Sequence, residues 1–215
     1  MSSNCVLKAD WASFDAAKYA CLHWHYSKTI PIGKLVKVGF WEDERFIGVI
    51  IFSRGTCKNI GAPFGLDQTE VCELTRVALT DHVHPTSKML KIGMAMLKRL
   101  CPKLRLIVSY ADSFQKHVGT IYQATNWVYV GPVVTPSYLK NGKRIADRGI
   151  GTICTELGIS RKEYAERHGI EIVKMRKFKY VMPLDKKMRT AVAGLALPFP
   201  KKELLSSVET RASSN

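Results

Sequence analysis

The chain has 215 residues, 46% of them hydrophobic, which is enough for one sizeable domain with its own core and excludes a disordered polymer. It carries 33 Lys and Arg against 18 Asp and Glu, so its formal net charge is +15 and a polyanionic partner such as nucleic acid is expected. The longest apolar run, residues 46–52, contains a glycine and is too short to cross a bilayer, and the first residues show no secretion signal. We therefore expect a cytoplasmic protein with no membrane partner.

The first predicted element is a helix over residues 14–24. This segment is rich in Ala, its apolar groups fall at helical spacing, and Ser13 or Asp10 can cap its start. The polar run His25-Tyr26-Ser27-Lys28 follows the helix. The cysteines form no CxxC pair, so a structural zinc knuckle is not expected, and Cys21 is interpreted as a core residue rather than a ligand.

Strands and helices alternate over the central part of the chain. Runs of β-branched and aromatic residues over 35–41 and 46–53 predict a hairpin, and Gly and Pro mark 56–68 as a loop. Further strands are predicted over 70–79, 104–110 and 126–131, and helices over 88–100 and 119–125. This alternation predicts an α/β fold with a mixed central β-sheet and helices on both faces.

The final third of the chain becomes more basic. Asn141-Gly142 predicts a hairpin turn, residues 160–168 a charged helix, and residues 170–184 a strand with interleaved basic and aromatic side chains. We expect one folded domain over residues 1–184. A basic and then polar C-terminal tail is expected over residues 185–215.

A group of cations lies at the end of this last strand and just beyond it. Its members are Lys174, Arg176, Lys177, Lys179, Lys186, Lys187 and Arg189. Charges of this kind also protect an exposed strand edge from aggregation. Because the group lies in an already basic chain, we interpret it as a surface that contacts the phosphates of nucleic acid.

Several motifs resemble known proteins in their order along the chain. Tyr122 lies in a predicted helix that precedes an apolar strand, which resembles the end of the core of the GNAT acetyltransferase superfamily. More specifically, the chain resembles the phage Mom family of DNA-modification proteins over most of its length. The matching stretches are HYSK (25–28), PIGKL (31–35), FWE (40–42), FIGV (46–49), ELTRVAL (73–79), SYAD (109–112) and IYQA (121–124).

The resemblance implies a single GNAT-like catalytic domain that acts as a DNA-modification enzyme. The implied reaction converts the N6 amine of adenine in phage DNA to a carbamoylmethyl (methylcarbamoyl) form, which protects the DNA from host restriction. Double-stranded DNA is the expected partner, in the cytoplasm of the host cell. The residues that the resemblance implicates in activity are His25, Tyr26, Arg76, Asp112 and Tyr122.

The chemistry of adenine limits what the site must do. Its N6 amine is a weak nucleophile that is stacked and paired in a duplex, so we expect the base to be flipped out. Tyr26, Tyr122 or Trp24 could then stack on it. Asp112 is the preferred group to orient or deprotonate the amine, although the same residue could instead cap a helix before Phe114.

Two interpretations of His25 and Tyr26 stay open. They could act as an acid/base pair, or they could bind a metal together with Asp112, and the resembled family has been suspected of using iron. A nucleophile made of Ser27 and Lys28 is not expected, because adjacent residues of an extended segment point apart.

The predicted donor site departs from that of acyl-CoA enzymes, which hold a pyrophosphate with a Gly-rich loop at a helix N-terminus. Residues 83–93 contain Pro85, which has no amide hydrogen, and no Gly-rich turn, and this argues against acetyl-CoA. Arg76 is predicted to bind a carboxylate or phosphate of the donor, and Lys88 to attract an anionic donor. The donor of a glycine-like two-carbon unit stays unknown, and a charged tRNA is one source.

Two other functions remain as alternatives. One is an acyl-CoA-dependent N-acetyltransferase that acts on another amine. The other is a non-catalytic, basic nucleic-acid-binding protein, which the net charge alone would also explain.

Overall fold

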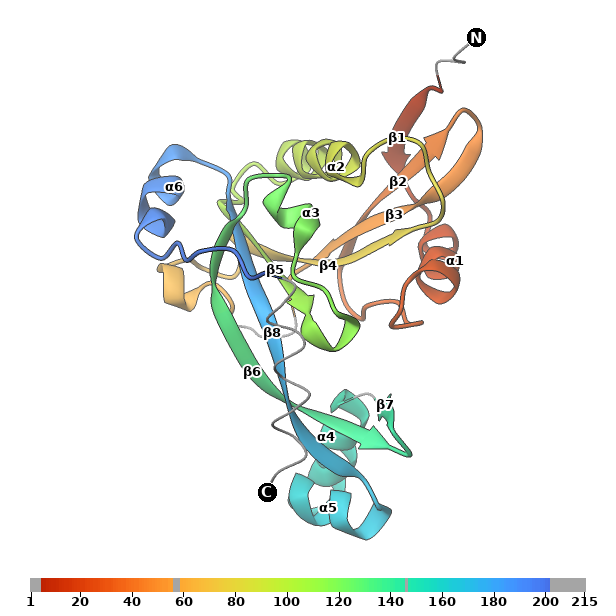
Figure 1. Ribbon diagram of the computed structural model, residues 1–215, viewed down its shortest axis with the longest axis vertical. Helices are drawn as coiled ribbons and strands as arrows, with labels where there is room; N and C mark the ends of the chain where they lie inside the picture. Colours follow the sequence, from red (N-terminus) through yellow and green to blue (C-terminus); the bar gives the residue numbers. More distant parts are fainter. Residues whose placement is uncertain (1–4, 56–58, 146, 202–215) are drawn as a thin grey trace. The chain divides into compact units, whose positions relative to one another are not determined.

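The computed structural model describes residues 5–55, 59–145 and 147–201, without the side chains of 147–149 (Figure 1). Over these residues the strands form one mixed eight-stranded sheet in the order β1-β2-β3-β4-β5-β8-β6-β7. The strands are β1 (Leu7–Trp11), β2 (Leu35–Glu42), β3 (Arg45–Ser53), β4 (Val71–Leu79), β5 (Leu106–Asp112), β6 (Val128–Lys140), β7 (Lys143–Ile145) and β8 (Glu171–Pro183). The helices are α1 (Phe14–Trp24), α2 (Thr86–Leu100), α3 (Thr120–Gln123), α4 (Asp147–Leu157), α5 (Arg161–His168) and α6 (Lys186–Ala193), with short 3-10 helices η1 (Ala62–Phe64) and η2 (Ser113–Gln115). The predicted α/β class with a mixed sheet is confirmed.

The backbone forms two compact units. Unit 1 comprises Met1–Tyr110, Gly119–Gly131 and Lys179–Phe199. Unit 2 comprises Ala111–Val118, Pro132–Phe178 and the chain from Pro200 onward. The strands β5, β6 and β8 contribute residues to both units. In the part of the chain that the structure describes, no helix is both long and apolar enough to cross a membrane.

Helices cover both faces of the sheet in unit 1. The helix α1 packs on the face that carries Val49 and Ile51 of β3. The helix α2 packs on the other face, where a Cβ added to Gly93 would lie 3.8 Å from atoms of Ile50 and Phe40. Because successive strand residues point to opposite faces of a sheet, Ile50 and Ile51 mark the two faces. The prediction of helices on both faces is confirmed.

The start of the chain contains a strand that the sequence did not predict. Five residues, Leu7–Trp11, form β1 and pair antiparallel with β2. The strand is short and its side chains are largely exposed, so it lacks the apolar alternation that identifies strands. Asp10 therefore lies in β1, and it is Ser13 that caps α1 by accepting a hydrogen bond of 3.1 Å from the Ala16 amide.

The central elements follow the sequence prediction closely, because each has a strong apolar period and clear ends. The hairpin β2–β3 turns at Asp43, whose φ of 55° is in the left-handed region. The strands β4 and β5 are parallel, and their paired register runs from Val71–Leu106 to Glu73–Val108. Residues 59–68 form turns and η1, as expected for a loop, whereas residues 56–58 of that loop lie outside the described residues.

The predicted hairpin in the final third is confirmed in unit 2. It joins β6 to β7 through Asn141 and Gly142, which have φ values of 51° and 71°. Two successive residues with positive φ form the type of turn that matches the twist of a hairpin. The strand β6 is longer than predicted and passes through Pro132 and Pro136. The strand lies between β8 and β7 in the sheet, and its pairing with β7 covers residues 138–140.

The C-terminal part of unit 1 corrects the predicted tail. Residues 186–193 form α6, because Asp185 caps the helix by accepting a hydrogen bond of 2.7 Å from the Met188 amide. The side chains of Met188 and Val192 are buried in an apolar cluster with residues of β4 and β5. Residues 202–215 of the predicted tail lie outside the described residues.

Candidate active site

A chain of hydrogen bonds links Tyr122 of α3 to β5 and β4 in unit 1. The Tyr122 hydroxyl of α3 is 2.8 Å from Ser109 Oγ of β5, and Ser109 Oγ is 2.8 Å from the Leu74 carbonyl oxygen of β4. A carbonyl only accepts hydrogen bonds, so Ser109 donates to Leu74, and the Tyr122 hydroxyl donates to Ser109. Leu74 and Ser109 follow directly after Glu73 and Val108, the last pair in the register of β4 and β5.

Tyr122 is held in its neutral form. Its ring is buried, with centroids 5.0 Å from those of both Trp127 and Tyr180. Burial raises the pKa of the Tyr122 hydroxyl far above its ordinary value, and the opposing effect of the Ser109 hydrogen bond is smaller. At neutral pH this hydroxyl can therefore donate a hydrogen bond or supply a proton, but it is not a phenolate base.

Electrostatic interactions with Tyr26 and Glu73 raise the pKa of the Tyr122 hydroxyl further. Tyr26 is 43% exposed and offers an accessible ring. Tyr122 is buried, and Trp24 packs against Phe46 with a centroid distance of 5.7 Å. Of the three aromatic residues predicted to stack on a base, Tyr26 is the one that a base can reach.

His25 has a defined tautomer. Its Nδ1 accepts a hydrogen bond of 3.1 Å from the Ser27 amide and lies 2.8 Å from Ser27 Oγ. Because Nδ1 is the acceptor, the neutral ring carries its hydrogen on Nε2. The ring is buried and lies 4.2 Å from that of Tyr26 between centroids. The rings of His25 and Tyr26 are therefore in contact.

Arg76 anchors the segment that carries His25. Its Nε donates to the Thr29 carbonyl at 3.3 Å, and its Nη1 donates to the Thr75 carbonyl at 2.7 Å. The remaining guanidinium hydrogens can still bind an anion. The predicted donor-binding residue is therefore also a positioning residue. Lys28, in the same segment, donates from Nζ to the His23 carbonyl at 2.9 Å.

Asp112 lies in unit 2, at the end of β5. Its Oδ1 accepts a hydrogen bond of 3.1 Å from the Phe114 amide, which confirms the cap before Phe114 that the sequence left open. Its Oδ2 is 2.6 Å from Arg144 Nη1 of β7. The carboxylate is buried, and the guanidinium compensates its charge.

The predicted iron ligands are divided between the two units, with His25 and Tyr26 in unit 1 and Asp112 in unit 2. His25 Nδ1 accepts a hydrogen bond from the Ser27 amide, and the two oxygens of Asp112 accept hydrogen bonds from the Phe114 amide and from Arg144. The iron site stays a prediction.

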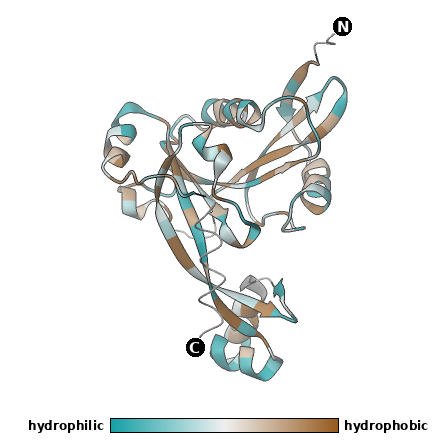
Figure 2. Cartoon of the chain, in the orientation of Figure 1, coloured by the Kyte–Doolittle hydropathy of each residue, from teal (hydrophilic) through white to brown (hydrophobic). Residues whose placement is uncertain are grey.

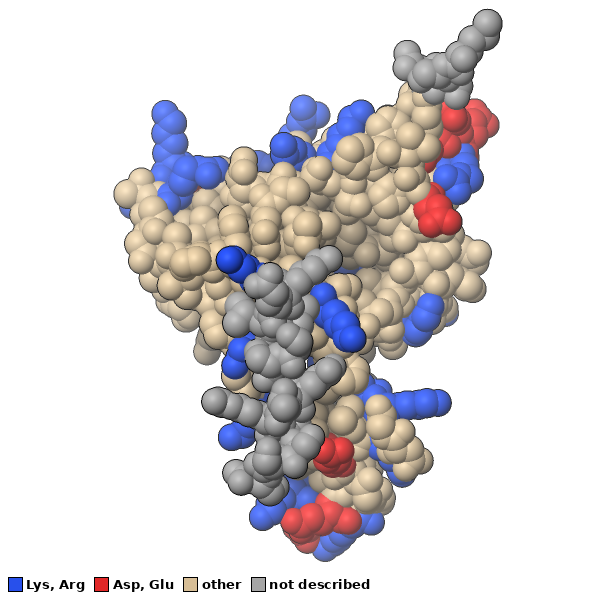
Figure 3. Space-filling view, in the orientation of Figure 1, with Lys and Arg blue, Asp and Glu red and all other residues tan. Residues whose placement is uncertain are grey.

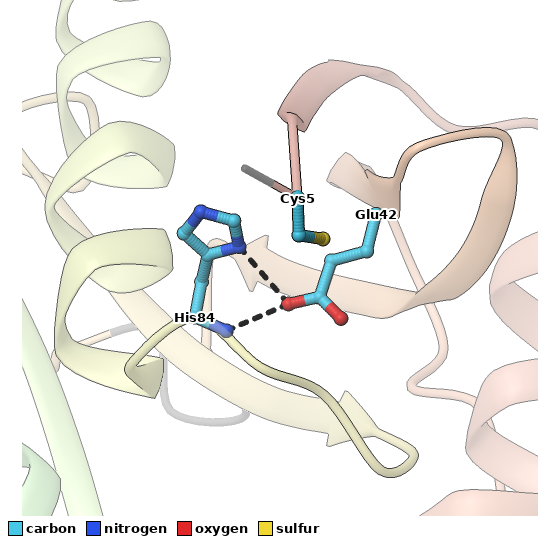
Figure 4. A group of neighbouring side chains, drawn as sticks. All are labelled: Cys5, Glu42 and His84. Carbon is cyan, nitrogen blue, oxygen red and sulfur yellow. Dashed lines mark hydrogen bonds and ion pairs between the residues drawn. The ribbon is translucent and has the colours of Figure 1, made fainter. Parts of the chain in front are cut away.

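Three other ligand-type residues come together in unit 1 (Figure 4). Within the described ranges, Cys5, Glu42 and His84 each place one ligand atom within 4.8 Å of the other two. The Glu42 carboxylate accepts hydrogen bonds from the Val83 amide at 2.8 Å, the His84 amide at 2.7 Å and His84 Nδ1 at 3.1 Å. Burial would raise the pKa of Glu42, but these hydrogen bonds outweigh it and hold the pKa below its ordinary value. The group fits an anchor for the loop before α2 better than a metal centre, because the carboxylate is already satisfied.

This anchor determines which groups lie at the N-terminus of α2. The Val83 and His84 amides point to Glu42 inside the protein, and Pro85, the N-cap, has no amide hydrogen and no side-chain cap. Lys88 follows in the first turn and is exposed. The loop is thus built around an internal carboxylate, with one cation close to the helix start.

The predicted nucleic-acid-binding cations are divided between the two units. Lys174, Arg176 and Lys177 lie in unit 2, and Lys179, Lys186, Lys187 and Arg189 lie in unit 1. Lys186, Lys187 and Arg189 are exposed on α6, whereas Lys179 Nζ lies 4.8 Å from the centroid of the Phe64 ring. Figure 3 shows many Lys and Arg side chains and few acidic ones on the visible face.

Residues 6–201 match the Mom protein family. The chain belongs to this family. The methylcarbamoylase Mom of Escherichia phage Mu is 23% identical over 186 residues, which cover 82% of this chain and 76% of that protein.

Solved structures show which fold this Mom-family chain has. A protein of Acinetobacter baylyi that is assigned as an acetyltransferase has a TM-score of 0.50 at 9% identity, over 86% of this chain and 96% of that one. The yncA protein of Salmonella typhimurium, solved with acetyl-CoA, has a TM-score of 0.45 at 12% identity, over 84% of this chain and 95% of that one. The first likeness identifies the fold as that of GNAT acetyltransferases, as the sequence predicted.

Sequence reasoning on the Mom-family chain missed two residues of the site. Ser109 and Glu73 surround Tyr122, although neither was a candidate. Their signal was a polar side chain in an otherwise apolar strand, which is uncommon without a hydrogen-bonding reason. Tyr26 acts on Tyr122 electrostatically, and a hydrogen bond to Thr29 links Arg76 to the segment after α1.

Proposed function

We propose that this Mom-family chain is a transferase that modifies the N6 amine of adenine in phage DNA to the methylcarbamoyl form and so protects the DNA from host restriction. The phage Mu relative is named a methylcarbamoylase, which supports this reaction. The single observation that carries the proposal is the hydrogen-bonded chain from Tyr122 through Ser109 to Leu74, beside the accessible ring of Tyr26.

The reaction needs one proton acceptor and one proton donor. Forming a bond from N6 to a donor carbon releases one proton from N6, and the group that leaves the donor takes one up. Tyr122 is neutral at pH 7 and is the proposed proton donor. Asp112, the carboxylate that the family resemblance implicates in activity, is proposed to accept the proton that N6 releases.

Adenine is proposed to enter the site flipped out of the duplex. Tyr26 then stacks on the base, a contact that contributes roughly 1–3 kcal/mol for a good base–aromatic pair.

The donor is proposed to be a glycine-like two-carbon unit on a charged tRNA rather than acetyl-CoA. Backbone amides hold pyrophosphate in acyl-CoA enzymes, but the Val83 and His84 amides are directed to Glu42. Lys88 and the remaining hydrogens of Arg76 are proposed to bind the anionic part of the donor. Modification reconstituted from purified protein and DNA without any tRNA would contradict a tRNA donor.

Mass analysis of nucleosides tests the proposed function. DNA from cells that express the protein should contain modified adenine, and cells that express Tyr122→Phe should contain almost none. Tyr19→Phe is a matched control, because it removes an exposed hydroxyl of α1 and should leave modification unchanged. Unmodified adenine in cells that contain soluble wild-type protein would overturn the proposal.

Because the fold is shared with acetyltransferases, a second candidate function is that of an N-acetyltransferase that uses acyl-CoA on another amine. Calorimetry with CoA separates the two, since tight binding would favour the acetyltransferase. Asp112→Ala separates an enzyme from a non-catalytic DNA-binding protein. An enzyme should lose turnover and keep its salt-dependent DNA affinity, whereas a binding protein would keep its whole activity.

A further inference from the structure

Two helices of unit 2 are joined by a turn of three residues. The helix α4 ends at Leu157, and Gly158 follows with a φ of 64°, a conformation that glycine adopts without strain. The Ile159 amide donates to the Cys154 carbonyl at 3.1 Å and closes the end of α4. Ser160 then caps α5 by accepting a hydrogen bond of 3.1 Å from the Glu163 amide. Gly158 and Ile159 thus end α4, and Ser160 caps α5, so these three residues make up the whole turn.

The second helix is held firmly by its inner face. Ala165 of α5 is buried, and Tyr164 packs against the cluster of Tyr138, Ile150 and Cys154 from β6 and α4. A Cβ at Gly151 of α4 would lie 2.8 Å from Arg161 Nη2, so the guanidinium of α5 lies against α4 at this glycine. A helix fixed in this way can present its outer face rigidly.

The outer face of α5 is polar and exposed (Figure 2). The side chain of Lys162 is 83% exposed and that of Glu166 is 68% exposed, and the two lie one turn apart on the same face. The neighbouring hairpin of unit 2 carries exposed Lys140 and Lys143 beside its turn. Lys and Arg outnumber Asp and Glu in unit 2 as a whole.

We propose that α4, the Gly158–Ser160 turn and α5 form a helix-turn-helix element that places α5 in the major groove of double-stranded DNA. Two helices joined by a three- to four-residue turn with glycine define this motif, and its second helix reads base edges. Lys162 and Glu166 are the side chains that face the bases, and the tip of the β6–β7 hairpin contacts the backbone phosphates. This inference rests on the proposed function, because it explains how a DNA-modifying enzyme selects the sequence around its adenine.

Groove geometry favours DNA over RNA as the partner of this element. The major groove of B-form DNA is wide enough for a helix, whereas that of double-stranded RNA is deep and narrow. A labelled DNA duplex should therefore bind more tightly than an RNA duplex of the same sequence. Equal affinity for the two duplexes would overturn the placement of α5 in the groove.

Charge reversal on α5 tests the proposal in the full chain. Lys162→Glu should weaken binding of a labelled DNA duplex, measured by fluorescence anisotropy, by about tenfold or more, and should lower the salt dependence of log affinity by about one. The matched control is Lys18→Glu, which makes the same charge change at an exposed position of α1 in unit 1. Circular dichroism and thermal unfolding establish that both variants are folded. Equal affinities for the two variants would overturn the proposal.

Sequencing of modified positions gives a second and independent readout. Glu166→Gln should keep duplex affinity within about threefold but change the bases preferred around the modified adenine, because a carboxylate and an amide accept and donate different hydrogen bonds. An unchanged preference would overturn the role of α5 in reading bases. If wild-type protein modifies no adenine while Lys162→Glu still loses duplex affinity, the proposed function fails and the DNA-binding element stands.

Discussion

The polar groups around Tyr122 form hydrogen bonds inside the protein, whereas those on the outer face of α5 are exposed to solvent. Around Tyr122, each hydrogen bond ends on another part of unit 1, and burial fixes the hydroxyl in one protonation state. On α5, Lys162 and Glu166 are exposed and contact one another at 3.9 Å. Exposed pairs of this kind contribute little to stability and exchange partners easily. The difference agrees with our two proposals, in which the Tyr122 region carries out the chemistry and α5 binds DNA.

Removal of the Tyr122 hydroxyl should cause the largest of the predicted effects, a loss of modification rate. Tyr122→Phe keeps the buried ring but removes the proton donor, so the modification rate should fall by about 10²–10⁴-fold. Duplex affinity should be unchanged, since the variant keeps both the Tyr26 ring that is proposed to stack on the base and the proposed contacts of α5. Single-turnover assays read by nucleoside mass analysis measure the rate. A variant with a normal rate would show that the hydroxyl has no part in the chemistry.

Changes at Arg76 should have a moderate effect and separate its two roles. Arg76→Ala frees the segment of His25 and Tyr26, and a misplacement of about 1 Å can lower a rate by about 100-fold. Arg76→Lys keeps the charge but cannot reach both the Thr29 and Thr75 carbonyls from one planar group. We expect the Lys variant to remain impaired in turnover assays. Full activity of Arg76→Lys would assign Arg76 to anion binding alone.

Glu42→Gln should lower stability rather than chemistry. The buried carboxylate accepts charge-assisted hydrogen bonds from Val83 and His84, so its loss should cost about 1.5–3 kcal/mol at pH 7. The pKa of Glu42 lies below its ordinary value of 4.5, so ionised Glu42 stabilises the fold above that pH. This contribution is lost as the pH falls through the folded-state pKa. Urea unfolding at pH 7 and at pH 3.5 should show a smaller difference between variant and wild type at the lower pH, and an equal difference would contradict the anchor.

The smallest effect is expected at α6. Asp185 caps this helix and accepts a hydrogen bond of 2.9 Å from Arg105 Nε, and both contacts lower the pKa of the carboxyl. Asp185→Asn keeps a capping oxygen but loses the charge, whereas Asp185→Ala loses the cap and should cost about 1 kcal/mol. Thermal unfolding should therefore rank wild type, Asn and Ala in decreasing stability. An Ala variant as stable as wild type would show that α6 is held by its apolar face alone.

Local patterns made the helices and strands with strong periods predictable. The apolar spacing of residues 14–24 and the charged tip between 42 and 45 predict α1 and the β2–β3 hairpin, and both are present. Short or glycine-rich elements carry no such pattern. The strand β1 has five largely exposed residues, and α4 contains Gly149 and Gly151, so neither was predicted.

The residue types of the candidate site could be predicted from the sequence, but the contacts between those residues could not. Family resemblance selected Tyr122, but its neutral state depends on Ser109, which lies on another element. The Glu42 anchor joins residues about 40 positions apart, and only the tertiary fold brings them together. The tautomer of His25 depends on one backbone amide and not on the side chains nearby.

One paired measurement tests most directly whether chemistry and DNA reading are separate. Modified adenine and duplex affinity would be measured on the same preparations of wild type, Tyr122→Phe and Lys162→Glu. We predict that Tyr122→Phe loses modification and keeps affinity, whereas Lys162→Glu loses affinity and regains modification at saturating DNA concentration. Loss of both properties in both folded variants, or a wild-type protein that modifies no adenine, would contradict the account.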